Sequence, residues 1–426
     1  MTDKREYSPI AHRRAVARPI RYKRTMQFRI WGSATVLAGG LALAVAGGSA
    51  GAPAGSELES YERAPGGETD DARDPSGTRP PATTSANRAK PRKLHRAETR
   101  IGPLDTAQRD HLYAGPEDAL TPTEVHYVKS NEIRHDVWIP YIRDVGGAYV
   151  GVGADQNYTL IGAARSEFVF LLDIDQRVVD LHRVYERLIE ASATPATLLA
   201  RFEPRAEAAT CELLRASFSR EPAAIRTRLV NGYRVARETV RRHLAHVSRR
   251  RHASESSSWL SHAGYYQHIR SLYHNDRVRI MGGDLTGART MSTVATNARA
   301  LGALIEVLYL SNAEEYFKYN RQYRANIAGL PSSRQGVALR TIYSKKWEHA
   351  ARLWNYQVHH LRDFQRRMVA SGSRSRTTML GLAARDKVLE RTTETKGLSR
   401  VATQPPAPVP VPVPVPDGLA ERSVQR

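Results

Sequence analysis

The sequence has a single cysteine, Cys211, among its 426 residues. One thiol excludes an intramolecular disulfide and any metal site built from several cysteines. Cys211 is followed by Leu213 and Leu214 in an apolar helical pattern. This pattern favours a buried small hydrophobe over a reactive thiol.

Familiar catalytic signatures are also missing. No GxSxG elbow joins a predicted strand to a predicted helix, and no GxxxxGK[ST] loop is present, which argues against the common hydrolase and P-loop classes. The close pairs His243 with His246 and His359 with His360 have no nearby third ligand and no HExxH frame. The sequence therefore predicts no metal site.

Positive charge is abundant, with a formal net charge of +21. Part of the excess lies in residues 1–29, which hold nine Lys or Arg against Asp3 and Glu6. An arginine-rich helical stretch ends in Arg249, Arg250 and Arg251, but it lacks interleaved aromatics and any known reading motif. We expect weak attraction to anionic surfaces and no specific nucleic-acid partner.

Composition divides the chain into five parts. Residues 1–29 form a basic cytoplasmic segment, and the uncharged residues 30–52 form a signal peptide or a signal anchor, since about 20 apolar residues can span a bilayer. A buried Gly/Ala-rich helix is the alternative for 30–52. Residues 53–103 predict a disordered linker, 104–372 one folded domain, and 373–426 a disordered Pro/Val-rich tail. The domain is thus expected outside the cytoplasm, anchored in the inner membrane or exported after cleavage.

The most informative stretch contains two apolar runs, 148–152 and 168–174, which predict buried strands. Gly151 and Gly153 end the first run, and a helix capped by Asn157 or Thr159 is expected to follow. Acids end the second run about 20 residues beyond the glycines, where a nucleotide-binding βαβ unit carries its ribose-binding carboxylate. The third glycine of the GxGxxG pattern is missing.

Further runs complete the expected fold. Residues 277–281, 305–310 and 337–343 predict three more strands, and 345–369 predicts a long amphipathic helix. About a hundred mostly helical residues separate the second strand from the third, more than an ordinary crossover needs. We expect an α/β, Rossmann-like fold: a mostly parallel sheet, helices on both faces, and a helical insertion between the second and third strands.

Four segments resemble a known family: 128–142 (VKSNEIRHDVWIPYI), 146–175 (GGAYVGVGADQNYTLIGAARSEFVFLLDID), 279–287 (RIMGGDLTG) and 308–317 (LYLSNAEEYF). Together they resemble an uncharacterised bacterial family with a class I S-adenosylmethionine-dependent methyltransferase-like Rossmann fold. The likeness spans roughly residues 121–370. It implies S-adenosylmethionine as the cofactor.

The resemblance implies roles for single residues. Gly151 and Gly153 would line the methionine and ribose part of the cofactor, and Asp173 or Asp175 would bind the ribose hydroxyls. Asp284 would lie near the adenine amino group.

The methyltransferase pattern is matched on the acceptor side but not throughout. Ser311 and Asn312 occupy the usual place of acceptor-side residues, with Asn312 a candidate catalytic group. However, Tyr149 and Val150 stand where an acid usually precedes the glycine loop, and the NPPY motif is missing.

Each candidate also has a structural reading. Ser130 and Asn131 are expected either in the pocket wall or as a helix cap. Glu132, if partly buried, could act as a general base, and Asp284 is a second candidate base. Gln156 and Asn157 would bind the cofactor or cap their helix. Otherwise the glycine loop would be a tight turn without a ligand. Asp173 and Asp175 would cap a helix or form a surface pair, and Asp284 would form a turn.

Two functions follow from these patterns. The first is a membrane-tethered or exported domain that binds S-adenosylmethionine and transfers a methyl group to an unknown acceptor. The second is a non-catalytic cell-envelope protein that uses the Rossmann-like fold as a scaffold for a partner or another ligand. Export through residues 30–52 would separate the domain from a cofactor made in the cytoplasm and would favour the second.

Overall fold

The computed structural model describes residues 101–402 except 121–122, 253–254, 344–346, 351–353, 371 and 392–394. The predictions for the basic segment 1–29, the apolar segment 30–52, the linker up to residue 100 and the tail beyond 402 lie outside the described residues. Within the described part, no helix is both long and apolar enough to cross a membrane.

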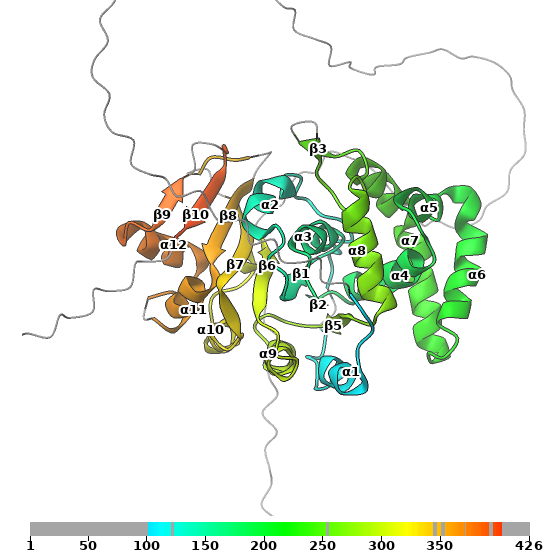
Figure 1. Ribbon diagram of the computed structural model, residues 1–426, viewed down its shortest axis with the longest axis horizontal. Helices are drawn as coiled ribbons and strands as arrows, with labels where there is room; N and C mark the ends of the chain where they lie inside the picture. Colours follow the sequence, from blue (N-terminus) through cyan, green and yellow to red (C-terminus); the bar gives the residue numbers. More distant parts are fainter. Residues whose placement is uncertain are drawn as a thin grey trace, which may run out of the picture. The chain divides into compact units, whose positions relative to one another are not determined.

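A sheet of eight strands runs through the domain in the order β5-β2-β1-β6-β7-β8-β10-β9 (Figure 1). Its strands are β1 (Ala148–Val152), β2 (Phe168–Asp173), β5 (Val278–Gly282), β6 (Ile305–Ser311), β7 (Ser332–Tyr343), β8 (Trp354–His360), β9 (Leu389–Arg391) and β10 (Leu398–Val401). The first five in spatial order are parallel, β8 is antiparallel to β7, and β9 is antiparallel to β10. The predicted α/β class with a mostly parallel sheet is confirmed.

The two central strands form because their apolar runs can be buried on both faces. All five residues of β1 are buried, and Val150 lies opposite Phe170 of β2 and Leu308 of β6. Successive side chains point to opposite faces of the sheet, so Tyr149 belongs to one core and Val150 to the other. The sheet therefore separates two hydrophobic cores.

Twelve α-helices are described, and they cover both faces of the sheet. One core holds residues of α2 (Ile139–Ile142), α3 (Gln156–Ala164), α4 (Gln176–Glu190), α5 (Pro195–Ala200), α6 (Glu207–Ser217), α7 (Ala223–Val247) and α8 (Ala263–His274). The other holds residues of α1 (Thr106–Tyr113), α9 (Thr290–Ala300), α10 (Arg321–Ala328), α11 (Leu361–Val369) and α12 (Arg376–Arg385).

The residues between β2 and β5 form the helices α4 to α8 and a small hairpin of β3 (Arg251–His252) and β4 (Glu255–Ser256). Helix α4 packs on β2 and β5, whereas α6 and α7 pack on α4 and on each other. Figure 1 shows α5, α6 and α7 on the side of α4 that faces away from the sheet. These outer helices make one wall of the cavity described below.

The single long helix predicted over 345–369 is wrong. Its last nine residues form helix α11, but residues 354–360 form β8, which pairs antiparallel with β7 from Val337↔His360 to Tyr343↔Trp354. The segment WNYQVHH also alternates in a period of two, and pairing with a long neighbouring strand decides between the two periods. The helix α3 likewise begins at Gln156 after Asp155, so neither Asn157 nor Thr159 is its cap.

The sequence put the end of the folded domain at residue 372, whereas the structure adds α12, β9 and β10 beyond it. These elements bury a third, small core around Ile342, with Leu380 and Val401 among its members. Strand β10 pairs with β8 along its whole length, from Leu398 to Val401. The apolar residues of α12, β9 and β10 are spread over a polar stretch without a clear period. Composition therefore did not indicate these elements.

Residues 101–120, here called the N-terminal strap, cover the outer edge of β5. The Tyr113 hydroxyl donates to the Val278 carbonyl over 3.1 Å, and the buried Arg279 donates to the carbonyls of Leu112 and Gly115 over 3.1 Å each. These bonds join the start of the described chain to a strand far along the sequence. The strap therefore completes one side of the sheet.

Candidate functional site

The turn after β1 is held by one buried side chain, that of Asn157. Its Nδ2 donates to the carbonyls of Val152 (3.0 Å), Gly153 (3.2 Å) and Ala154 (2.8 Å), and its Oδ1 accepts from the Tyr149 hydroxyl (2.8 Å). Both the donor and the acceptor side of this buried amide are therefore engaged within the protein. Asn157 therefore shapes the glycine turn from inside the protein.

The two glycines of this turn make room for the protein's own side chains. A Cβ on Gly151 would lie 2.0 Å from Asn157 Oδ1, and a Cβ on Gly153 would lie 2.4 Å from Gln156 Nε2. Gly153 also has a φ of +84°, which favours glycine. Gln156 is 5% exposed. Close packing against Asn157 and Gln156 thus accounts for both glycines.

The two acids that follow β2 lie beside this turn. Asp173 accepts from the backbone N–H groups of Gly153 (2.9 Å) and Asp175 (2.8 Å). Burial raises the pKa of the Asp173 carboxyl to about 6, although these hydrogen bonds oppose the shift. Asp175 is the N-cap of α4 and accepts from the Arg177 N–H over 2.9 Å. Asp175 therefore caps a helix and also lines a cavity, whereas Asp173 caps no helix and holds backbone N–H groups beside the glycine turn.

The loop after β5 is packed against the N-terminal strap. Asp284 Oδ1 accepts from the Thr286 backbone N–H (2.7 Å) and hydroxyl (2.8 Å), so Asp284 forms a turn. A Cβ on Gly282 would lie 2.9 Å from Leu120, and one on Gly287 would lie 2.5 Å from Asp118. The space near Asp284, where the resemblance puts an adenine, is bordered by side chains of the strap.

Glu132 is the centre of a buried polar cluster at the ends of β6 and β7. Its carboxylate is fully buried and accepts from Tyr309 Oη (2.6 Å), Ser311 Oγ (2.8 Å) and Thr341 Oγ1 (2.6 Å). His135 Nε2 lies 3.3 Å from the same carboxylate. Burial raises the pKa of Glu132, but the bonds from its partners outweigh burial, and the pKa lies below its usual range. Glu132 is buried as a carboxylate and structurally occupied.

The neighbours of Glu132 are also held in the structure. Ser130 Oγ accepts from the Glu132 N–H over 3.0 Å, and the Asn131 carbonyl accepts from Trp354 Nε1 over 3.3 Å. Ser311 has a φ of +49°, a strained value for a residue with a side chain. Asn312 is half-buried and donates to Glu315 over 3.4 Å.

The sequence-predicted residues thus fall into two groups and one outlier. The group at the ends of β1 and β2 comprises Gly151, Gly153, Gln156, Asn157, Asp173 and Asp175, and the group at the ends of β6 and β7 comprises Ser130, Asn131, Glu132, Ser311 and Asn312. Asp284 lies apart, after β5. Within each group several polar atoms bond to one another, while Gln156 Oε1 is buried without a hydrogen-bond partner in the described ranges.

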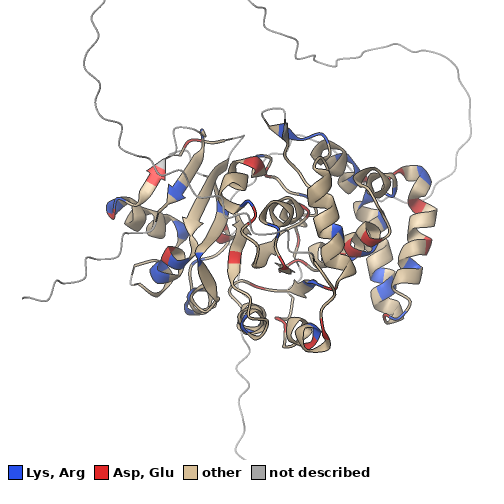
Figure 2. Cartoon of the chain, viewed as in Figure 1, with Lys and Arg blue, Asp and Glu red and all other residues tan. Residues whose placement is uncertain are grey.

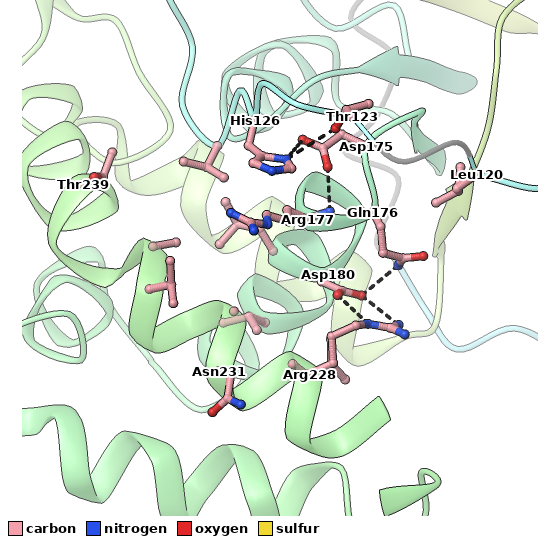
Figure 3. Close-up of a pocket in the computed structure, with 17 residues that line it drawn as sticks. Leu120, Thr123, His126, Asp175, Gln176, Arg177, Asp180, Arg228, Asn231 and Thr239 are labelled. Carbon is pink, nitrogen blue, oxygen red and sulfur yellow. Dashed lines mark hydrogen bonds and ion pairs between the residues drawn. The ribbon is translucent and has the colours of Figure 1, made fainter. Parts of the chain in front are cut away.

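A cavity of about 800 Å³ lies beside the first group, between the start of α4 and the middle of α7 (Figure 3). Its lining residues are Leu120, Thr123, His126, Val128, Asp175, Gln176, Arg177, Asp180, Leu181, Val184, Arg228, Leu229, Asn231, Gly232, Val235, Ala236 and Thr239. This volume suits a small organic molecule. Of the residues predicted from the sequence, Asp175 is the one that lines it.

Two pairs of polar side chains face this cavity. His126 Nδ1 lies 2.9 Å from Asp175 Oδ2, and the His126 side chain is 24% exposed, so the ring is reachable. Asp180 accepts two bonds from Arg228, over 2.8 Å from Nε and 3.1 Å from an Nη. Sequence reasoning missed these pairs because no motif contains them: each joins residues 48 or 49 positions apart.

The arginines on the rest of α7 are largely paired. Glu207 lies 3.1 Å from Arg237, and Glu238 lies 2.9 Å from Arg241 and 2.6 Å from Arg242. Figure 2 shows acidic segments interleaved with the basic ones along the helices on this side. In the described ranges there is no group of three or more His, Cys, Asp or Glu placed to hold a metal ion.

Comparison with known families adds one finding. A family model described as a domain of unknown function, DUF7790, matches residues 127–402, which includes both groups and most of the cavity lining. A comparison with curated proteins finds no match.

Proposed function

Because this chain belongs to the DUF7790 family, whose function is unknown, we propose a function from its own geometry. The domain is a binding module that holds a small organic molecule in the cavity between α4 and α7. The cavity of about 800 Å³ at the carboxyl end of β2 carries this proposal. In open α/β sheets, ligands bind at the carboxyl ends of the strands.

The proposed architecture is Rossmann-like. The parallel strands β5-β2-β1-β6-β7 stand third, second, first, fourth and fifth along the chain among these five, which is the order of a doubly wound sheet. The strand order reverses between β1 and β6, where such folds usually have their cleft, whereas the proposed cavity lies at the end of β2. Helices α5, α6 and α7 form the proposed insertion between the second and third of these strands, and α7 supplies a wall of the cavity.

Binding is favoured over catalysis because the candidate bases are already engaged. Glu132 is fully buried under three hydroxyl donors, and Asp284 holds a turn. A general base must reach the proton it removes. The non-catalytic scaffold is therefore the better supported of the two functions that the sequence suggests.

Methyl transfer from S-adenosylmethionine is the second candidate. The observation in its favour is Asp173, which ends β2 next to Gly153, the position that the resemblance gives to a ribose-binding carboxylate. Ligand binding there would require Asp173 to exchange its backbone bonds for ribose hydroxyls.

We further propose that residues 30–52 anchor the domain in the inner membrane or export it, with the binding module outside the cytoplasm. This topology agrees with a scaffold better than with an enzyme whose cofactor is made in the cytoplasm.

The test compares two glycine variants of the purified full chain. Gly232 lines the cavity and Gly381 lies on the surface of α12, and a Cβ on either glycine meets nothing within 4 Å. Ligand-observed NMR with a set of small organic fragments should give hits that Gly232→Phe abolishes and Gly381→Phe retains. If no hit responds to Gly232→Phe, the cavity is not the binding site.

The second candidate has its own measurement. Calorimetry of the full chain with S-adenosylmethionine and S-adenosylhomocysteine should show micromolar binding that Asp173→Ala removes, if methyl transfer is the function. Absence of heat at millimolar ligand would eliminate that candidate and leave the binding module standing.

A further inference from the structure

The carboxylates in the cavity wall are already balanced by partners. Asp175 lies against His126 and also accepts the N–H of Arg177 at the start of α4. Asp180 holds Arg228 through two hydrogen bonds and accepts a third from Gln176 over 2.9 Å. An incoming cation would have to compete with these bonds. The negative charge in the wall is therefore satisfied before any ligand arrives.

The positive charge in the wall is not all satisfied. The exposed Arg177 side chain pairs with no carboxylate among the described residues, and Figure 3 shows it among the side chains that line the cavity. His126 lies against Asp175 through Nδ1, and in the neutral ring a donating Nδ1 leaves Nε2 as an acceptor, which does not bind an anion. The guanidinium fork of Arg177 is a group that binds carboxylates or phosphates.

Much of the remaining lining is apolar, although Thr123, Asn231 and Thr239 also line the cavity. Leu181 and Val184 of α4 and Leu229 of α7 are buried among the lining residues, and Val235 is 74% exposed. Gly232 stands between them in the interior of a helix of 25 residues, where glycine lowers helix stability relative to alanine. No atom occupies the space beside it within 4 Å of an added Cβ. The glycine thus leaves room beside an apolar wall.

We infer that the ligand of this cavity is an organic anion with an apolar portion, bound by Arg177 at the mouth and by the α4 and α7 walls below it. This inference rests on the proposed function, because it names the ligand class of the same site. The anionic group, a carboxylate or a phosphate, makes charge-assisted hydrogen bonds to the guanidinium. The apolar portion of the ligand is removed from water where it packs on the α4 and α7 walls.

The test uses probes that share one chain and differ in charge. Calorimetry of the full chain measures octanoate, octyl phosphate, octanol and octylammonium, with acetate as the anion that lacks the chain. Octanoate or octyl phosphate should bind at least about tenfold more tightly than octylammonium and acetate, because each lacks one of the two recognised features. The tighter of the two anions identifies the headgroup.

Three variants separate the possible outcomes. Arg177→Gln should weaken the anionic probes at least about tenfold and leave octanol unchanged. Arg177→Lys keeps the charge but loses the fork, so it should restore only part of the loss. Gly232→Phe should abolish binding of every octyl probe, and Gly381→Phe should leave it intact.

The inference and the function beneath it fail differently. Equal binding of octanoate and octylammonium, both blocked by Gly232→Phe, would overturn the anionic ligand and keep the cavity as a binding site. Acetate binding as tightly as octanoate would overturn the apolar portion. Binding of the octyl probes that ignores Gly232→Phe would overturn the inference and count against the cavity itself.

Discussion

The carboxylate of Asp173 accepts a hydrogen bond from the backbone N–H of Gly153 across 2.9 Å. This bond ties the end of β2 to the turn that follows β1, so the acid and the glycine of the nucleotide-like pattern hold each other. The same carboxylate is buried enough that its pKa rises from 3.8 to about 6. The pair therefore makes folding sensitive to pH in a defined window.

Asp173 should lower stability as pH rises from about 4 to about 6. A raised folded pKa means that the native state holds the proton more tightly, so the stabilisation is present below pH 3.8 and is lost through pH 6. The loss is on the order of 3 kcal/mol. Urea unfolding at several pH values should show this slope in the wild type and not in Asp173→Asn, while Asp110→Asn, an exposed site, should keep it. A slope shared by all three proteins would contradict the assignment.

Glu132→Gln should destabilise the domain by about 2 kcal/mol or more. Tyr309, Ser311 and Thr341 all donate to this carboxylate. In glutamine, the amide nitrogen is itself a donor and cannot accept a bond from these hydroxyls. Thermal unfolding measures the effect. The exposed Glu124→Gln serves as the control and should change stability by less than about 0.5 kcal/mol. Equal melting temperatures for both variants would show that the cluster around Glu132 is not rigid.

A buried ion pair between β7 and the turn after β6 offers a third prediction. Arg340 is fully buried and lies 3.0 Å from Glu314, which also accepts from Tyr323 over 2.8 Å. Arg340→Met alone should cost about 3–5 kcal/mol, because it leaves an uncompensated buried carboxylate. Adding Glu314→Gln to that variant should recover part of the loss, since it removes the stranded charge. Denaturant unfolding of the single and double variants measures the coupling, and purely additive losses would speak against it.

Two glycines inside helices should respond oppositely to alanine. At Gly232 an added Cβ has open space, so Gly232→Ala should stabilise the domain by about 0.5–1 kcal/mol. At Gly162 of α3 the added Cβ would lie 2.5 Å from Tyr265 Cβ, so Gly162→Ala should destabilise by about 1–3 kcal/mol. Calorimetric melting compares the two. Loss of stability at Gly232 would mean that the space beside it is closed.

The sequence predicted the central strands well because their signal is local. The run 148–152 is β1 to the residue, and 168–174 overshoots β2 by one residue. Both runs are apolar on every side, as strands buried on two faces must be. The predicted strand 337–343 is the second part of the longer β7. Where the segment alone decided the structure, pattern was sufficient.

The sequence pattern was insufficient where residues far away along the chain determine the structure of a segment. Strand β8 exists because β7 pairs with it, and its sequence also fits a helix. The candidate site shows the same limit: Asn157 and Asp173 were predicted as ligand-binding groups, yet each bonds to backbone around the glycine turn. His126 and Arg228 reach the cavity only through the tertiary fold.

The N-terminal strap has a consequence for how far the domain can be trimmed. It lies before residue 127, where the family match begins, yet Tyr113 and Glu117 bind Val278 and Gly282 of β5. An outer strand with free N–H and C=O groups is a template on which a second chain can add a strand and start aggregation. A protein cut to the family boundary would expose that template. We therefore expect a protein without the strap to self-associate more readily than the full chain.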